Sequence, residues 1–205
     1  PGWTLNSTVD ELLKKEFDQC RKSQVPHRLM VKSNMENIVP FDHPDIDKWR
    51  DALRGGIKHR YKDTNLIIKG GVDDIWFNKA TEEIIIVDYK SQASFYRVNT
   101  EDYLSNVFHE SYKVQMDIYA YLFERNDFNV AEISYFYVAN CRKDLDGFNS
   151  KLVFDETLVP YRLRTHWIEP KIDEMLTTLN SPDLPYFNSF CQNCACSKAR
   201  AECEY

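Results

Sequence analysis

Glycine and proline are scarce in this sequence, with 6 and 8 residues respectively among 205. There is no low-complexity tract and no internal repeat, which argues against collagen-like, disordered and solenoid classes. No apolar run approaches the roughly 18 residues that a transmembrane helix requires, and no signal-peptide pattern is present. We therefore expect an ordinary globular protein with a sizeable core, in the cytoplasm and without a membrane partner.

Basic charge is not in excess either. Lys and Arg together number 26 against 32 Asp and Glu, which gives a net charge of −6. This balance argues against a protein that coats nucleic acid non-specifically. A basic stretch at residues 48–62 fits either a nucleic-acid contact or a solvated helix face with interleaved acids. Its cations are Lys48, Arg50, Arg54, Lys58, Arg60 and Lys62.

Two β-strands joined by a tight turn are predicted at residues 72–78 and 83–89, which are rich in β-branched and aromatic side chains. If residues 79–82 form the turn, counting back along both strands places Asp73 directly opposite Asp88. Opposed side chains point to the same face of a sheet, with Cβ atoms about 5 Å apart. The two carboxylates are therefore expected to be neighbours.

Asp73 and Asp88 form a candidate metal site. Two carboxylates this close repel each other, and a cation between them would relieve the repulsion. A hard divalent ion that prefers oxygen ligands, Mg²⁺ or Mn²⁺, suits the pair. Lys90 shares the face of Asp88 and could hold a water or a phosphate oxygen. Two acids and a lysine around a metal suit phosphodiester hydrolysis.

The next acid in the chain, Asp74, is predicted to point to the opposite face of the sheet, alongside Trp76. This assignment depends on register, because a one-residue bulge would exchange Asp73 and Asp74. The site face otherwise carries apolar side chains that we expect to bury against a helix. These are Ile75, Phe77, Ile84 and Ile86.

The same residues resemble the motifs of the PD-(D/E)xK nuclease superfamily. Residues 71–73 (GVD) match its G-x-D element, and residues 88–90 (DYK) match its D-x-K element. Downstream, residues 115–119 (QMDIY) are similar to the Q-x-x-x-Y motif of the RecB-like and CRISPR-associated exonuclease branch. Each motif alone is weak, but their order and their placement on strand, strand and helix are fairly specific.

The resemblance implies an α/β fold, in which a restriction-endonuclease-like mixed sheet has flanking helices. It also implies that the backbone carbonyl of Tyr89 joins the two carboxylates around the metal. Gln115 would position the lysine, the water or the phosphate, and Gln115 and Tyr119 would contact the substrate. The implied catalytic residues are Asp73, Asp88, Lys90 and Gln115.

RecB-like nucleases also place a metal-ligating histidine before the first motif strand. Residues 55–59 (GGIKH) resemble their G-x-x-x-H pattern, which makes His59 a candidate ligand and leaves His43 as a rival. A lone histidine is more often structural or solvent-facing, so the assignment stays open.

The remaining elements are predicted from periodicity and from Gly and Pro positions. Helices are expected at 8–22, 44–55, 102–125 and 156–180, strands at 65–69, 130–139 and 151–154, and loops at 23–43 and 91–101. This order agrees with the mixed α/β core that the resemblance implies.

Four of the six cysteines lie in the tail, at Cys191, Cys194, Cys196 and Cys203. Without a secretory signal, thiolates in this spacing favour a metal over disulfides, either Zn²⁺ or an iron–sulfur cluster. The exonucleases resembled here often use three late cysteines and an early one for a 4Fe–4S cluster, which makes Cys20 a candidate ligand. The C-x-C spacing of this tail departs from that pattern. We expect a nuclease-like domain at 1–185 and a Cys-rich metal-binding appendage at 186–205.

The sequence thus predicts a metal-dependent DNA nuclease, exonuclease-like, that acts on single- or double-stranded DNA. Repair or phage-defence proteins are candidate partners. Two alternatives remain: a nuclease fold that binds nucleic acid without cutting, and an interaction module built around the cysteine tail. Polarity of cutting, a preference for RNA, and the biological pathway are open.

Overall fold

The computed structural model describes residues 4–183, 186, 188 and 190–203. The chain divides into two units, Pro1–Thr165 and His166–Tyr205. The predicted domain boundary, after residue 185, falls within the second unit at a position outside the described residues. Among the helices described, none combines the length and the apolar character needed to cross a membrane.

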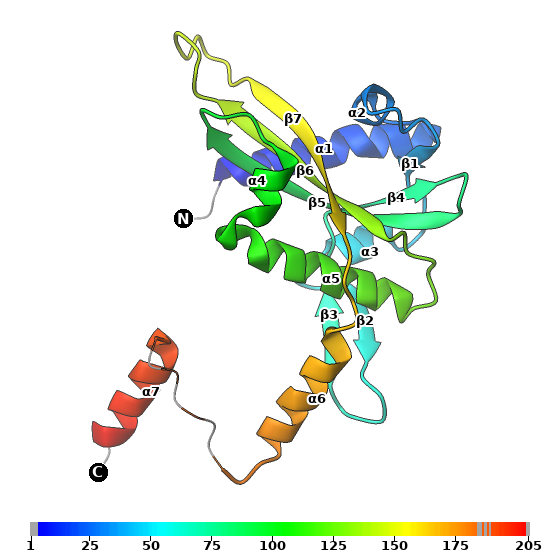
Figure 1. Cartoon of the computed structure of the whole chain (residues 1–205). Helices are drawn as coiled ribbons and strands as arrows, with labels where there is room; N and C mark the ends of the chain where they lie inside the picture. Colours follow the sequence, from blue (N-terminus) through cyan, green and yellow to red (C-terminus); the bar gives the residue numbers. More distant parts are fainter. Residues whose placement is uncertain (1–3, 184–185, 187, 189, 204–205) are drawn as a thin grey trace. The chain divides into compact units, whose positions relative to one another are not determined.

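The first unit is a mixed α/β structure around a five-stranded sheet with the order β1-β4-β5-β6-β7, in which only β5 and β6 run parallel (Figure 1). Strands β2 and β3 form a separate antiparallel pair, here called the β2–β3 ribbon. The strands of the first unit are β1 (Ile38–Pro40), β2 (Ile57–Arg60), β3 (Ile67–Gly70), β4 (Asp74–Asn78), β5 (Glu83–Ser94), β6 (Ile133–Arg142) and β7 (Phe154–Arg162).

The helices of this unit are α1 (Thr4–Ser23), α2 (Arg28–Lys32), α3 (Ile46–Arg50), α4 (Thr100–Ser105), the short 3₁₀ helix η1 (Val107–His109) and α5 (Glu110–Glu124). The second unit contains α6 (Ile168–Leu179) and α7 (Gln192–Cys203). The mixed sheet with flanking helices confirms the predicted fold class.

Two apolar layers hold the sheet between helices. On one face, Ile75 and Ile86 lie in a buried cluster with Met116 of α5, as the alternation of the strands predicted. On the other face, Trp76 lies in a second cluster with Phe17 of α1. Because the clusters lie on opposite faces, α1 and α5 fix the sheet from both sides.

The predicted hairpin is present with the predicted register. Asn78 pairs with Glu83, and Asp74 pairs with Val87. Glu82 adopts φ 57° at the end of the turn, which permits the tight reversal. Strand β5 is longer than predicted and runs on to Ser94, because it pairs in parallel with β6 along its second half.

Residues 154–162 were expected to be mainly helix, and that prediction was wrong. They form β7, in which buried Val159 and Tyr161 alternate with exposed Pro160 and Arg162. A proline lacks the N–H that a central strand needs, and β7 lies at the edge of the sheet where this is tolerated. Of the helix predicted at 156–180, only the later part is helical, as α6.

The predicted helix at 102–125 is also interrupted. The Asn99 side chain accepts hydrogen bonds from the backbone of Glu101 and Asp102, which starts α4. The Asn106 side chain accepts one from Phe108, which starts η1 before α5 begins. Asparagine side chains compete for backbone donors in this way, and so they break a helical pattern that apolar spacing alone would continue.

Three shorter segments also differ from expectation. The loop predicted at 23–43 contains α2 and the edge strand β1, and the helix predicted at 44–55 is reduced to α3. The strand predicted at 65–69 does not join the hairpin but pairs with β2 in the ribbon. Each difference depends on contacts with distant residues, which local pattern does not report.

A buried ion-pair cluster joins the sheet to two helices. Asp74 is fully buried, and its Oδ1 accepts hydrogen bonds from Arg21 of α1 at 2.5 Å and Arg50 of α3 at 2.8 Å. Its Oδ2 accepts the hydroxyl hydrogen of Tyr89 at 2.7 Å. Asp18 pairs with both arginines from the outer side. Asp74 therefore points away from Asp73, as predicted, and the cluster fixes the start of β4.

Asp74→Asn should lower the free energy of unfolding by about 3 kcal/mol, because it leaves two buried guanidinium groups with one carboxylate. Urea denaturation measures this loss, with Asp63→Asn in the exposed ribbon loop as a control that should change stability by less than about 0.5 kcal/mol. Equal effects of the two changes would show that the cluster adds no net stability.

Candidate active site

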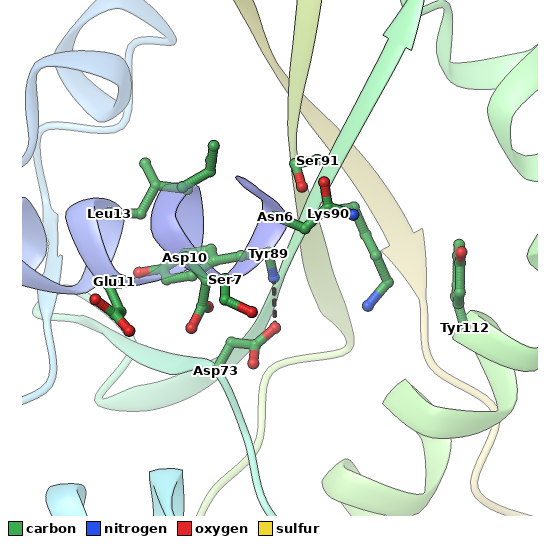
Figure 2. A pocket seen from close by; sticks show the side chains of 11 residues that line it. Asn6, Ser7, Asp10, Glu11, Leu13, Asp73, Tyr89, Lys90, Ser91 and Tyr112 are labelled. Atoms are coloured by element: carbon green, nitrogen blue, oxygen red, sulfur yellow. Dashed lines mark hydrogen bonds between the residues drawn. The ribbon is translucent and has the colours of Figure 1, made fainter. Parts of the chain in front are cut away.

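The structure brings three predicted site residues together where β4 and β5 diverge. Asp88 of β5 is 1% exposed, and Asp73 directly precedes β4. The backbone N–H of Tyr89 donates to Asp73 Oδ2 at 2.8 Å, which turns that carboxylate toward β5 (Figure 2). The Lys90 ammonium forms an ion pair with Asp88. The predicted grouping of two acids and a lysine is therefore present.

Burial perturbs the pKa values of both carboxylates. Burial and the nearby charge of Asp88 raise the pKa of Asp73 to about 7, against the opposite effects of Lys14, Lys90 and the Tyr89 N–H. Burial likewise raises the pKa of Asp88, although Lys90 and a hydrogen bond with Asp73 lower it. Such a pair holds a proton near neutral pH unless a cation compensates for the repulsion.

A pocket of about 360 Å³ opens beside the acid pair. Its lining combines Asp73, Lys90 and Tyr112 with residues from the first turns of α1, including Asp10 and Glu11 (Figure 2). The Lys90 ammonium lies 4.6 Å from the centre of the Tyr112 ring, a cation–π contact that directs it across the pocket. The site is therefore open enough to admit part of a substrate.

Helix α1 contributes charged residues to the site that the sequence reasoning missed. Lys14 Nζ lies 4.0 Å from Asp73 Oδ1 and 2.9 Å from Asp10 Oδ2. A signal was present, because Asp10 and Lys14 precede Phe17 at helical spacing and so share its inward-facing side. Charged residues on the buried stripe of a helix indicate a polar site beneath it.

Gln115 and Tyr119 lie on the neighbouring helix α5 and contact each other. Gln115 Nε2 donates to the Tyr119 hydroxyl at 2.6 Å. The charges of Asp88 and Asp73 add to burial and raise the pKa of Tyr119 to about 12, while Gln115 lowers it. Tyr119 is thus within electrostatic reach of the acid pair.

A second pocket of about 420 Å³ is lined by residues of both this helix and the ribbon. It is lined by Gln115, Tyr119, Lys69 and the pair Gly70 and Gly71. A Cβ atom at Gly70 would lie 2.8 Å from the Tyr119 ring, so glycine is required for the close approach. The pocket offers a surface for substrate, and its lining residue Gly71 precedes Asp73 by two positions in the chain.

Neither candidate histidine lines the acid-pair pocket. His59 lies on β2, with its ring 6.0 Å from that of Tyr121 in an edge-on arrangement. His43 stacks on Trp49 at 4.4 Å, and its Nδ1 accepts a hydrogen bond from the Asp45 backbone. Both rings thus have packing roles, and the structure adds no support for either as a metal ligand.

The acid pair fits a divalent cation of the Mg²⁺ or Mn²⁺ type. Asp88 Oδ2 is buried and, among the described residues, accepts no hydrogen bond of normal geometry, although the Lys90 ammonium contacts it. Asp73 and Asp88 provide oxygen donors only, which hard cations prefer. A cation here would also relieve the repulsion between the two carboxylates.

The tail cysteines do not form a comparable site. Cys194, Cys196 and Cys203 lie on α7, and Cys191 precedes it. At 100° per residue, Cys194 and Cys196 point to opposite sides of the helix. No group of three or more His, Cys, Asp or Glu side chains that could hold an ion is found in the described part of the chain. The structure therefore gives no support to the predicted zinc or iron–sulfur site or to Cys20 as its ligand.

The mixed sheet, the flanking helices and the acid–acid–lysine grouping at the hairpin define a restriction-endonuclease-like protein. The chain belongs to the PD-(D/E)XK nuclease superfamily, whose family model matches residues 5–199. Members of this superfamily generally hydrolyse phosphodiester bonds and typically use divalent metals. Comparison with curated proteins and with solved structures gives no match for this chain.

The raised pKa of Asp73 predicts how the stability of the metal-free protein depends on pH. Between its ordinary value and about 7, the folded state keeps a proton that the unfolded chain has released. Stability should therefore fall as the pH rises from about 4 to about 7.

Asp73→Asn removes one charge of the pair and should flatten this pH dependence. Chemical denaturation in EDTA at several pH values measures the effect, and Asp63→Asn serves as the control. A parent protein whose stability rises over that pH range would contradict the raised pKa of Asp73.

Proposed function

We propose that the protein is a metal-dependent nuclease that hydrolyses phosphodiester bonds in DNA. The observation that carries this proposal is the grouping of Asp73, Asp88 and Lys90 at the β4–β5 hairpin, where Asp73 and Lys90 line an open pocket, in a chain that belongs to this superfamily. Membership of the superfamily supports a nucleic-acid substrate. DNA as that substrate, and Mg²⁺ or Mn²⁺ as the cation, are the finer parts of the proposal.

In this proposal Asp73 and Asp88 hold the cation, and the backbone carbonyl of Tyr89 completes the protein ligands. When bound, the metal polarises the scissile phosphate and lowers the pKa of a water. The hydrogen bond from the Tyr89 N–H keeps Asp73 turned toward β5, so the ligands are positioned before the metal arrives. No covalent intermediate is needed, because a water attacks directly.

Lys90 orients the attacking water and stabilises the negative charge that develops on the phosphate. Its ammonium already contacts Asp88 and lies over the Tyr112 ring, which restricts it to the pocket. Gln115 and Tyr119 bind the substrate backbone from α5. Their mutual hydrogen bond leaves the Gln115 carbonyl oxygen and second amide hydrogen available to a ligand.

The Q-x-x-x-Y pair supports an exonuclease of the RecB-like kind as the finer assignment. The main rival is a nuclease fold that binds nucleic acid without cutting, and the intact acid–acid–lysine set disfavours it. Incubation of end-labelled DNA with Mg²⁺ or Mn²⁺ separates the two. Progressive shortening from an end would support the exonuclease, whereas full-length DNA under all conditions would support the rival.

Lys90→Ala should lower the cleavage rate by a hundredfold or more, on the order of what a positioned proton-transfer or charge-stabilising group contributes. Gel-based cleavage under single-turnover conditions measures the rate. Lys15→Ala, an exposed lysine on α1, is the matched control and should cleave at the parent rate. Near-normal cleavage by Lys90→Ala would remove Lys90 from the mechanism.

Asp73→Asn and Asp88→Asn should each abolish Mn²⁺ binding measured by calorimetry, because each removes one charged ligand from a two-carboxylate site. Asp74→Asn, corrected for its lower stability, should still bind Mn²⁺, since its side chain lies on the other face. Loss of binding in Asp74→Asn alone would reverse the assignment of the two neighbouring acids.

A further inference from the structure

The β2–β3 ribbon carries a cluster of positive charge on one side. Lys58 pairs directly with Lys69, and Arg60 pairs with Ile67, so all four side chains lie on the same face. These side chains are exposed, whereas Ile57 and His59 turn inward. We call Lys58, Arg60 and Lys69 the basic face of the ribbon.

The acidic partners that would neutralise a surface cation are missing from this face. None of its three cations forms an ion pair with a carboxylate in the described ranges of the chain. Lys69 donates to the Leu53 carbonyl at 3.0 Å, and Arg60 donates to the Thr64 carbonyl at 3.3 Å. The whole chain has a net charge of −6, but these three neighbouring cations, which lack carboxylate partners among the described residues, form a local positive surface.

The structure resolves the two interpretations of the basic stretch at 48–62. Arg50 belongs to the buried cluster around Asp74 and Asp18 and is not available to a ligand. Lys48 is paired with Asp45 on α3. Lys58 and Arg60 instead lie on an exposed strand. The stretch is thus not one solvated helix face, and its strand portion keeps the free charge.

The basic face is continuous with the candidate active site. Lys69 lines the pocket that also contains Gln115 and Tyr119. Asp73 follows Lys69 by four positions in the chain, a span of at most about 14 Å of extended chain. Phosphates of one DNA strand follow each other at about 3.4 Å along the helix axis. A phosphate held by Lys69 would therefore lie within a few nucleotides of one at the acid pair.

We propose that the basic face of the β2–β3 ribbon binds the sugar-phosphate backbone of duplex B-form DNA next to the cleavage site. The inference rests on the proposed function for its choice of nucleic acid as ligand. In Figure 1 the ribbon extends beside α5 and away from the five-stranded sheet, so its exposed face can approach a long ligand.

Shape and composition favour a duplex over a single strand. Two strands about 4.8 Å apart form a ribbon narrow enough for the DNA major groove, which is about 12 Å wide. The major groove of A-form RNA is too narrow for side chains to read. Single-strand binders stack bases on aromatic side chains, and the exposed residues of β2 and β3 are Lys58, Arg60, Ile67 and Lys69.

The triple variant Lys58→Ala, Arg60→Ala, Lys69→Ala tests this proposal in the full chain. Its affinity for a fluorescein-labelled DNA duplex of about three helical turns is measured by fluorescence anisotropy in EDTA, which prevents cleavage. Loss of three phosphate contacts should weaken binding by about tenfold or more and make the log–log salt slope shallower by about 2 to 3.

The matched control removes the same positive charge elsewhere, by Lys15→Ala, Lys22→Ala and Lys32→Ala on the exposed sides of α1 and α2. This control should keep the parent affinity and salt slope. A charge-keeping variant of the basic face, Lys58→Arg with Lys69→Arg, should also bind like the parent. Melting temperature and Mn²⁺ affinity of each variant show whether it is folded.

Two results would overturn the proposal: parent-like binding by the triple variant, or an equal loss in the control. Equal affinity of the parent for the labelled DNA duplex, its single strand and the matching RNA duplex would overturn the assignment to B-form DNA. Failure of the proposed function would give a different result from failure of this inference. The parent would then bind the duplex through the basic face but would cut no DNA with Mn²⁺.

Discussion

The buried Asp74 carboxylate constrains the rest of this structure more than any other group. An isolated carboxylate in a protein interior costs several kcal/mol, so its position is stable only where donors surround it. Arg21, Arg50 and Tyr89 supply those donors from α1, α3 and β5. Because one carboxylate requires all three, it sets where both helices meet the sheet. That arrangement also aligns the first turns of α1 with the pocket beside the acid pair.

Two adjacent aspartates thereby take opposite roles. Asp74 has its hydrogen bonds satisfied by side chains and serves the fold. Asp73 accepts a hydrogen bond from the Tyr89 N–H, and its burial, together with the charge of Asp88, raises its pKa. Tyr89 contacts both acids, through its backbone on one face and its hydroxyl on the other. A buried carboxylate pair that a cation would stabilise further is suited to binding one, and this pair lies next to Asp74, whose hydrogen bonds are already satisfied.

The hairpin and its acid pair could be predicted because turn length and strand alternation fix register locally. Strand β7 could not, since its alternation is short and its Pro160 is acceptable only at a sheet edge, which sequence does not reveal. Arg50 looked like part of a basic surface, because its partner Asp74 is distant in the chain. Asp10 and Lys14 enter the site only through the packing of α1 on the sheet. The unpredicted features thus share one cause, which is dependence on contacts far apart in sequence.

The ribbon and the acid pair are joined by a segment that packs closely against its neighbours. A Cβ atom at Gly70 would meet the Tyr119 ring at 2.8 Å, and one at Gly71 would meet the Ala52 backbone at 2.5 Å. These close contacts hold the chain between β3 and β4 on both sides. Any side chain larger than glycine at either position would displace these neighbours and so change how the ribbon is placed relative to Asp73. Because positioning of reactants accounts for a large part of catalysis, the two glycines matter for a ligand that contacts both the ribbon and the acid pair.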